Sequence, residues 1–203
     1  AAALADGADA LAITDRDGLY GSIKHLKACI KHGMDPILGV DLATLEPARQ
    51  TNDAKTRNPL RVSGRIIILA KGHGNGAGYK ALCRLVSAAH QPTTPHGIRK
   101  QHIGITPGEL ATHALDPTGE PLLTILLGPN SDEGLATQHH RYDQARTRIH
   151  RWRTLLGERT LRVEIVTHLN NPGERLSTAH AIRMLRCAET ANIAPILTNA
   201  VRY

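Results

Sequence analysis

The stretch Ala12-Ile13-Thr14-Asp15-Arg16-Asp17-Gly18-Leu19-Tyr20-Gly21 sets the pattern for the whole chain, because an apolar strand runs into two carboxylates and then into a helix. The strand is predicted at residues 10–14 and the helix at residues 21–32. In parallel α/β folds, functional sites gather at the carboxyl ends of strands, so acids placed there are candidate metal ligands or bases. In a plainer reading, Asp17-Gly18 forms a turn and caps the helix. The stretch alone leaves both readings open.

The same alternation of strand and helix continues along the chain. Short runs rich in Ile, Leu and Val each predict a buried parallel strand, at residues 37–40, 65–70, 122–127, 161–166 and 195–198. Further helices are predicted at residues 78–90, 131–156 (broken near Gly134) and 174–192. Strands that alternate with helices indicate an α/β fold with a largely parallel sheet or barrel. No linker divides the chain, so we expect a single domain over residues 1–203.

Two stretches interrupt this rhythm, at residues 44–64 and 91–106, and both are rich in Pro, Thr, Asn and charged residues. We interpret them as surface insertions or mobile loops. The first seven residues read as the last turns of a helix that ends near Gly7. A chain that starts inside an element is typical of a fragment, so we expect an upstream part to be missing.

The composition limits the classes of function. The chain has 203 residues, a formal charge of +7 and a pI near 9.7, which suit a polyanionic partner such as nucleic acid, although a solvated basic surface explains them equally well. With no Phe, one Trp and four Tyr, the core must be aliphatic, and extensive stacking on bases is not expected. Three distant cysteines without a CxxC pair, no apolar run long enough for a membrane span and no signal-peptide pattern indicate a cytoplasmic protein.

Three more predicted strands end in polar residues. Asp41 follows residues 37–40, His168 follows residues 161–166, and the last strand runs into Thr198-Asn199-Ala200. A buried acid at such a place needs a cation or hydrogen-bond donors. Together with the first stretch, these strand ends form a plausible site, although none is specific by itself.

At this point the residues resemble a known family. Residues 14–21 are similar to the T-D-H-D-G-L-Y-G motif of the PHP domain (polymerase and histidinol phosphatase domain) of bacterial C-family DNA polymerases, and residues 37–42 resemble its I-I-G-A-E-L. Residues 66–90 resemble the H-L-V-V-L-A and G-Y-x-x-L-C-R-L-I-S-x-A-H of the polymerase branch, residues 164–168 its E-L-x-x-H, and residues 198–203 its T-N-D-V-H-Y. The matches span nearly the whole chain in order, and their wording leans toward the error-prone type of polymerase.

The resemblance implies a distorted (β/α)7 barrel of the PHP type, here N-terminally incomplete, whose strand ends hold up to three metal ions for phosphoester hydrolysis or 3′-to-5′ exonuclease proofreading. The chain departs from the family at several ligand positions. The His of T-D-H-D is Arg16, and the His expected before the third strand is Arg65. The Asp and His of N-D-V-H are Ala200 and Arg202, and the family's Glu is shortened to Asp41. The opening H-x-H of the family would lie upstream of residue 1.

Three vestigial candidates for metal ligands remain: Asp15, Asp41 and His168. An arginine has no lone pair to offer a metal ion and stays protonated at any working pH. We therefore expect guanidinium groups to occupy the space of the ions and to pair with Asp15 and Asp41, because an unpartnered buried carboxylate is costly. No cofactor is expected, or zinc, manganese or magnesium if any site survives.

These observations predict a structural module of a DNA polymerase III α-type subunit, whose nucleotidyl transfer for replication or translesion synthesis resides elsewhere in the parent protein. The expected partners are the other modules of the polymerase, DNA and other polymerase subunits. One rival is a residual phosphoesterase or exonuclease, and a free-standing histidinol-phosphatase-like enzyme is disfavoured by the polymerase-type motifs. Another rival is a basic DNA-binding module, in which one helix contacts phosphates through Arg146, Arg148, Arg151 and Arg153. A solvated or partner-facing helix side is the plainer reading of those arginines.

Overall fold

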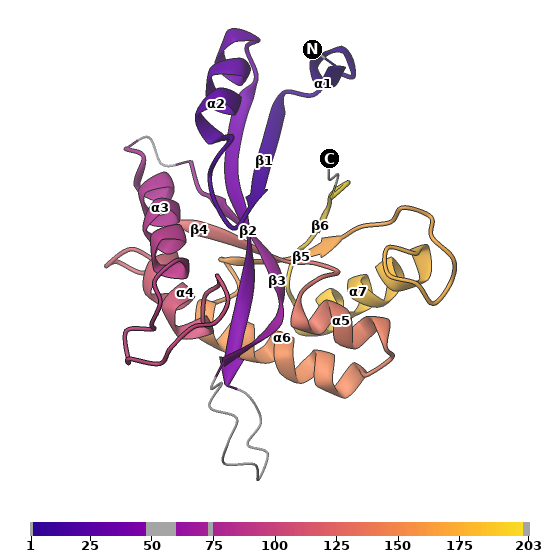
Figure 1. The fold of residues 1–203 in the computed structure, drawn as a ribbon. Helices are drawn as coiled ribbons and strands as arrows, with labels where there is room; N and C mark the ends of the chain where they lie inside the picture. Colours follow the sequence, from indigo (N-terminus) through magenta and orange to yellow (C-terminus); the bar gives the residue numbers. More distant parts are fainter. Residues whose placement is uncertain (1, 48–59, 73–74, 201–203) are drawn as a thin grey trace.

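The protein is built on one curled sheet of six strands in the part of the chain that the computed structural model describes, residues 2–47, 60–72 and 75–200 (Figure 1). The strands lie side by side in the order in which they occur along the chain. They are β1 (Ala10–Arg16), β2 (Asp35–Pro47), β3 (Leu60–Ala70), β4 (Leu123–Leu127), β5 (Leu161–Ile165) and β6 (Pro195–Leu197). The predicted α/β fold with its curled, barrel-like sheet is confirmed, and every predicted strand exists.

The direction of the strands differs from the prediction. β1 is parallel to β2, and β4, β5 and β6 are parallel to one another, but β3 runs antiparallel to both β2 and β4. On one side the pairing itself shows the direction, because Pro47 at the end of β2 lies opposite Leu60 at the start of β3, as in an antiparallel pair. The prediction of six buried parallel strands was therefore wrong for β3. It was also wrong for β6, whose three residues are all exposed, and for β1, none of whose residues is buried.

The predicted insertion at residues 44–64 is mostly strand where the structure describes it. β2 continues to Pro47 and β3 begins at Leu60, so both borders of the insertion pair with each other across an irregularity at Thr44/Leu45. Residues 48–59 lie outside the described residues. The second predicted insertion, residues 91–106, has no helix or extended strand. Lys100 and Ile105 are buried in it, which anchors the segment to the body of the protein.

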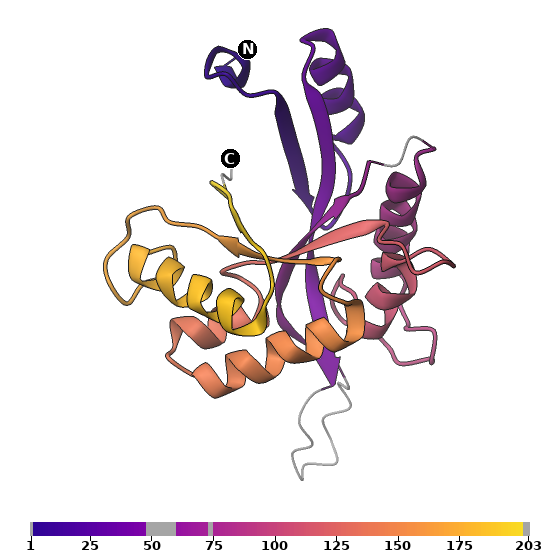
Figure 2. The ribbon, with the colours of Figure 1, turned by 180° about the vertical axis from the view of Figure 1, so that it is seen from behind.

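Seven helices accompany the sheet in the described ranges. They are α1 (Ala2–Ala5), α2 (Ser22–Lys31), α3 (Ala77–Ala89), α4 (Pro107–Ala114), α5 (Asp132–Gln138), α6 (Tyr142–Leu156) and α7 (Thr178–Ala191). Helix α2 lies beside β1 and β2, which project from the rest of the molecule, while α3 and α4 lie on one side and α5, α6 and α7 on the other (Figures 1 and 2). None of the helices in these ranges is long and apolar enough to cross a membrane.

Two helix predictions need correction. Helix α4 was not predicted, although its start carries a complete signal: Pro107 is the first helical residue, and Thr106 and Glu109 bond reciprocally to each other's backbone N–H. The predicted break near Gly134 is also wrong, because Gly134 lies inside α5 and the chain breaks at His140, whose φ is 56°. A Cβ at position 134 would lie 2.2 Å from the carbonyl oxygen of Gly128, so the glycine permits close packing.

The core is aliphatic, as the composition predicts. Alternate residues of β3, Ile66 and Ile68, are fully buried and pack with Leu82 and Leu85 of α3. The one tryptophan, Trp152, joins this core from α6 and donates its Nε1–H to Asp132 Oδ1 at 3.0 Å. The opposite face of β3 carries Arg65, Ile67 and Leu69, which are half-buried. That alternation places Arg65 outside the apolar core and toward the end of β1.

Candidate functional site

The end of β1 is held by a tight set of backbone contacts. Asp17 adopts a left-handed conformation with φ of 58°, and its N–H donates to the carbonyl oxygen of Asp41 at 2.9 Å. His90, at the end of α3, donates from Nε2 to the carbonyl oxygen of Asp17 at 2.6 Å. Gly21 donates its N–H to Asp15 Oδ2. The turn that follows β1 is therefore fixed to both β2 and α3, so the positions of its carboxylates are well defined.

Arg65 joins two of the carboxylates at this point. Its Nε donates to Asp41 Oδ1 at 2.8 Å, and its Nη2 donates to Asp17 Oδ1 at 2.7 Å. The same Nη2 also donates to the carbonyl oxygen of Asp41 at 2.8 Å. The side chains are 16% exposed for Arg65, 3% for Asp41 and 25% for Asp17. One guanidinium therefore bridges a buried carboxylate on β2 and a partly exposed one after β1.

Two opposing effects act on the charge of Arg65. Burial lowers the pKa of the guanidinium, because a charge is less well solvated inside a protein. The hydrogen bond to Asp17 and the negative charge of Asp41 raise it, and together they prevail, so the pKa of Arg65 lies above its ordinary value. The guanidinium is therefore a permanent cation at every pH at which the protein folds.

The three predicted metal ligands do not come together. Arg16 of β1 is level with Asp41 of β2 in the parallel register, so neighbouring Asp15 points to the other face of the sheet, where its carboxylate meets the start of α2. His168 lies beyond β5 and donates from Nε2 to the carbonyl oxygen of Asn199 at 2.6 Å. Among residues 2–47, 60–72 and 75–200, no group of three or more His, Cys, Asp or Glu side chains could hold a metal ion.

The substituted ligand positions have different outcomes. Arg65 pairs with Asp41, as predicted. Arg16 does not pair with Asp15: its side chain is 66% exposed, and its Nε lies 3.8 Å from Asp17 Oδ2. The expectation that Asp15 receives a guanidinium is not met by Arg16 or Arg65, because the alternation of side chains along β1 places Asp15 on the opposite face of the sheet from Arg65. Ala200 is described, with φ of 43°, and Arg202 lies outside the described residues.

The basic helix α6 does not present a uniform row of free arginines. Arg148 pairs with Asp132, Arg151 with Glu46 and Arg153 with Glu158. Arg146 has no carboxylate partner among the described residues and instead lines a cavity between α6 and α7. Arginines that are already paired are less available to phosphates, so the structure gives the predicted DNA contacts of this helix no particular support. These contacts stay a prediction.

Sequence reasoning missed a buried ion pair. Lys100 Nζ lies 2.8 Å from Glu109 Oε1, with both side chains almost completely buried, and Nζ also donates to the carbonyl oxygens of Ala88 and Gly104. The pair ties the irregular segment at residues 91–106 to the start of α4. The capping motif at Thr106 was the one available signal, since it marks Glu109 as a helix-start residue.

A pair of buried acids at the start of α5 was also missed. Asp132 and Glu133 are both almost completely buried. Burial and the nearby negative charge of Asp132 raise the pKa of Glu133 well above its ordinary value, although a hydrogen bond from Ser131 opposes the shift. Its Oε2 is buried and has no hydrogen-bond partner in the described surroundings, which also disfavours the charged form.

Comparison with known proteins places the chain. The PHP domain family matches residues 1–168. The chain belongs to the PHP domain family. Two relatives of this PHP chain are the DNA polymerase III subunit alpha of Chlamydia pneumoniae, 36% identical over 83 residues, and the error-prone DNA polymerase of Mycobacterium bovis, 33% identical over 84 residues. Each match covers 41% of this chain but 6% and 7% of the relative, so the relatives are much longer proteins.

The fold of the PHP chain was also compared with solved structures. A crystal structure from Bifidobacterium adolescentis, of a protein named only provisionally as a metal-dependent phosphoesterase, is 13% identical. The comparison covers 97% of this chain and 78% of the other, with a TM-score of 0.42. The predicted relationship to the PHP domains of DNA polymerase III α-type proteins is confirmed by the family and sequence matches.

Proposed function

We propose that this chain is the PHP module of a DNA polymerase III α-type subunit, and that it serves there as a structural domain whose own phosphoesterase site is inactive. Nucleotidyl transfer, for replication or translesion synthesis, belongs to other parts of the parent polymerase. The partners of the module are then the neighbouring modules, other polymerase subunits and DNA. A cytoplasmic location follows from that role.

The observation that carries the proposal is the bridge formed by Arg65. Asp41 and Asp17 together bring two negative charges, and a divalent ion is one way to neutralise such a pair. Here the guanidinium supplies a fixed positive charge and donates to both carboxylates. Because a guanidinium offers no lone pair, its presence supports structural neutralisation over metal-dependent chemistry.

The other residues present do not fit a divalent ion at this place. Asp15 Oδ2 accepts the N–H of Gly21 and faces α2, and His168 contacts Asn199 beyond β5. Arg65 Nε already lies 2.8 Å from Asp41 Oδ1, so an ion bound to Asp41 would lie close to the guanidinium. Two positive charges this close repel strongly in a partly buried setting. We derive no reaction step through a metal ion for this chain.

Metal titration with a matched substitution tests the proposal. The expected result for the wild-type chain is no stoichiometric zinc or manganese by elemental analysis, no change in Tm with either ion, and no hydrolysis of bis(p-nitrophenyl) phosphate. Arg65→His replaces the permanent cation with an imidazole ligand, so zinc or manganese should raise the Tm of this variant. Arg159→His, at an exposed arginine paired with Glu120, adds the same imidazole elsewhere and should give no such response.

Two results would contradict the proposal. One is a stoichiometric ion in the wild-type chain that is lost in Asp41→Asn. The other is phosphodiester hydrolysis by the wild-type chain that Asp15→Ala abolishes, which would favour the residual phosphoesterase. The wild-type measurements decide between a structural module and a residual phosphoesterase. An Arg65→His variant that does not respond to metal therefore gives no support to the phosphoesterase.

A further inference from the structure

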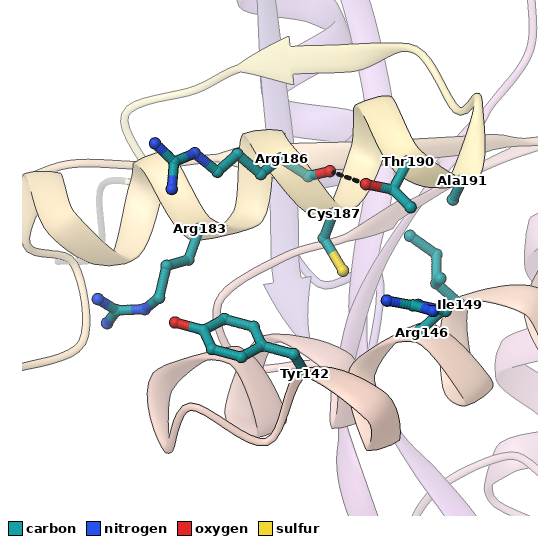
Figure 3. Close-up of a pocket in the computed structure, with 8 residues that line it drawn as sticks. All are labelled: Tyr142, Arg146, Ile149, Arg183, Arg186, Cys187, Thr190 and Ala191. Carbon is teal, nitrogen blue, oxygen red and sulfur yellow. Dashed lines mark hydrogen bonds between the residues drawn. The ribbon is translucent and has the colours of Figure 1, made fainter.

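A cavity of about 240 Å³ opens between α6 and α7, and neither Arg65 nor any residue of β1 lines it (Figure 3). Its volume is below the usual range for sites that enclose drug-sized ligands, so it suits one small chemical group or one nucleotide unit. The side chains that define it are Tyr142, Arg146 and Ile149 of α6 and Arg183, Arg186 and Cys187 of α7.

The spacing of these residues explains why they meet. Tyr142, Arg146 and Ile149 are separated by four and three positions, so they form one stripe along α6. Arg183 and Arg186 are three positions apart and form a similar stripe along α7. In Figure 3 the guanidinium of Arg183 lies beside the Tyr142 ring. The two stripes face each other, and the cavity is the space between them.

The cavity concentrates positive charge that the described part of the chain leaves unneutralised. Arg146, Arg183 and Arg186 form none of the ion pairs found there, whereas Arg148 and Arg153 of the same helix α6 each have a carboxylate partner. No acidic side chain lines the cavity. Three arginines without a carboxylate partner therefore line one pocket, so an anion that enters it meets only positive charge.

Arg183 adds a second, independent indication of a missing acceptor. Its Nε donates to the carbonyl oxygen of Thr137 at 3.0 Å, which holds the guanidinium in place. Its Nη2 is buried and has no acceptor within the described surroundings. Buried donors of this kind are normally satisfied, so the guanidinium of Arg183 keeps hydrogen-bonding capacity that the described residues do not use.

We propose that this pocket binds the phosphate monoester of a nucleotide, either free or at the 5′ end of a DNA strand. A phosphate monoester carries close to two negative charges and three terminal oxygens, so it matches three guanidiniums better than a carboxylate with one charge and two oxygens. The apolar wall formed by Ile149 and the ring of Tyr142 receives the sugar or base. Tyr142 can stack on one base at most, which agrees with the pocket volume of about 240 Å³.

Protection of a cysteine tests where the ligand binds. Cys187 lines the pocket and Cys83 lies on α3, and both are half-buried, so Cys83 is an internal control in the same molecule. Burial raises the pKa of the Cys187 thiol, so alkylation is run at about pH 8.5, near the ordinary pKa of a thiol. Millimolar 5′-dAMP should slow alkylation of Cys187 at least threefold, read by mass spectrometry, and leave Cys83 unchanged. Deoxyadenosine, which lacks the phosphate, should protect neither.

Two variants test which charges bind. Arg146→Gln with Arg186→Gln removes two exposed guanidiniums and should weaken 5′-dAMP binding at least tenfold by calorimetry. Arg84→Gln removes an exposed helical arginine from α3 and should leave binding unchanged. A 5′-phosphorylated oligonucleotide that binds more tightly than 5′-dAMP identifies a strand end as the source, and the reverse identifies the free nucleotide.

Several outcomes would overturn the proposal. Equal protection by deoxyadenosine would show that the phosphate is not recognised, and succinate binding as tightly as 5′-dAMP would show a carboxylate site. Unchanged affinity in the Arg146→Gln, Arg186→Gln double variant, with a native circular dichroism spectrum, would place binding elsewhere. None of these measurements depends on the metal site, so the pocket and the proposed function of the module can fail separately.

Discussion

Replacing Arg65 with methionine should be one of the most destabilising single substitutions in this PHP chain. Methionine keeps the length of the side chain but leaves Asp41, with a side chain only 3% exposed, without its charged partner. Breaking a buried pair by removing one partner costs about 3–5 kcal/mol, because a charge is left buried. Asp17 is a quarter exposed and can be hydrated, so its share is no more than about 1 kcal/mol. We expect a total loss of about 3–6 kcal/mol in the free energy of unfolding.

Urea denaturation measures this loss, and two further variants show that it comes from the bridge. Arg16→Met removes an arginine that is largely exposed and 3.8 Å from Asp17, so it should cost less than about 0.5 kcal/mol. Asp41→Asn combined with Arg65→Met removes both charges and should recover about 2 kcal/mol relative to Arg65→Met alone. If Arg65→Met costs as little as Arg16→Met, with an unchanged urea slope, Arg65 does not neutralise Asp41 and the structural reading of the site is wrong.

Three further substitutions probe other parts of the fold by urea denaturation. The pKa of Glu133 is raised in the folded state, so Glu133 contributes fully to the free energy of unfolding below its unfolded pKa near 4.5. This contribution is lost as the pH rises through the folded-state pKa. Glu133→Gln should therefore stabilise the chain by about 1–3 kcal/mol at pH 8 and little at pH 4, and an equal effect at both would count against a neutral Glu133. Lys100→Met should lower the free energy of unfolding by about 3 kcal/mol, because it leaves Glu109 buried without Lys100. The double variant Lys100→Met, Glu109→Leu should lose much less, and equal losses would show that the two charges are not coupled. Gly64→Ala places a Cβ 2.6 Å from the backbone nitrogen of Asp132, at the start of α5, and should cost about 1–3 kcal/mol. Gly108→Ala places its Cβ in open space and should be tolerated. Similar costs for the two variants would refute the clash at position 64.

The positions of the strands could be predicted because each is a short apolar run between breaks. Their directions could not, because residues 65–70 look the same whether β3 runs parallel or antiparallel to β2. Direction depends on how the chain connects two strands, and the irregular composition of residues 44–64 concealed the fact that their borders pair. Composition shows that a segment is polar, but it does not show whether the segment is hydrogen-bonded to its neighbour.

The sequence predicted carboxylates at the end of the first strand but not which of them Arg65 contacts. Asp15 lies in β1 and Asp17 follows it, and the sequence does not show which of them shares a face with Arg65. The answer depends on the register between β1 and β2, where Arg16 is level with Asp41, and on the left-handed backbone of Asp17. In a regular strand Asp15 and Asp17 would point to the same face, and only the left-handed backbone of Asp17 separates them, which pattern alone does not reveal.

Contacts between distant segments were invisible for a different reason. Lys100 lies in a stretch whose composition is typical of a loop, and only its position beneath α3 and α4 shows that it is buried against Glu109. Arg146 and Arg186 belong to different helices, and each reads as an ordinary surface residue. Their proximity follows from how α6 and α7 pack, which hydrophobic patterning determines only roughly.

A guanidinium at the end of β1 has consequences that a divalent ion there would not have. Ion binding competes with protons for the carboxylates and depends on the supply of metal, so a site that uses it stabilises the fold conditionally. Arg65 is itself a residue of β3 and stays charged at every relevant pH. Its guanidinium therefore reaches Asp41 as soon as β2 and β3 pair. We therefore expect added metal not to raise the stability of a chain in which Arg65 neutralises Asp41. The structural role proposed above needs the permanent neutralisation of Asp41 and does not need a response to metal.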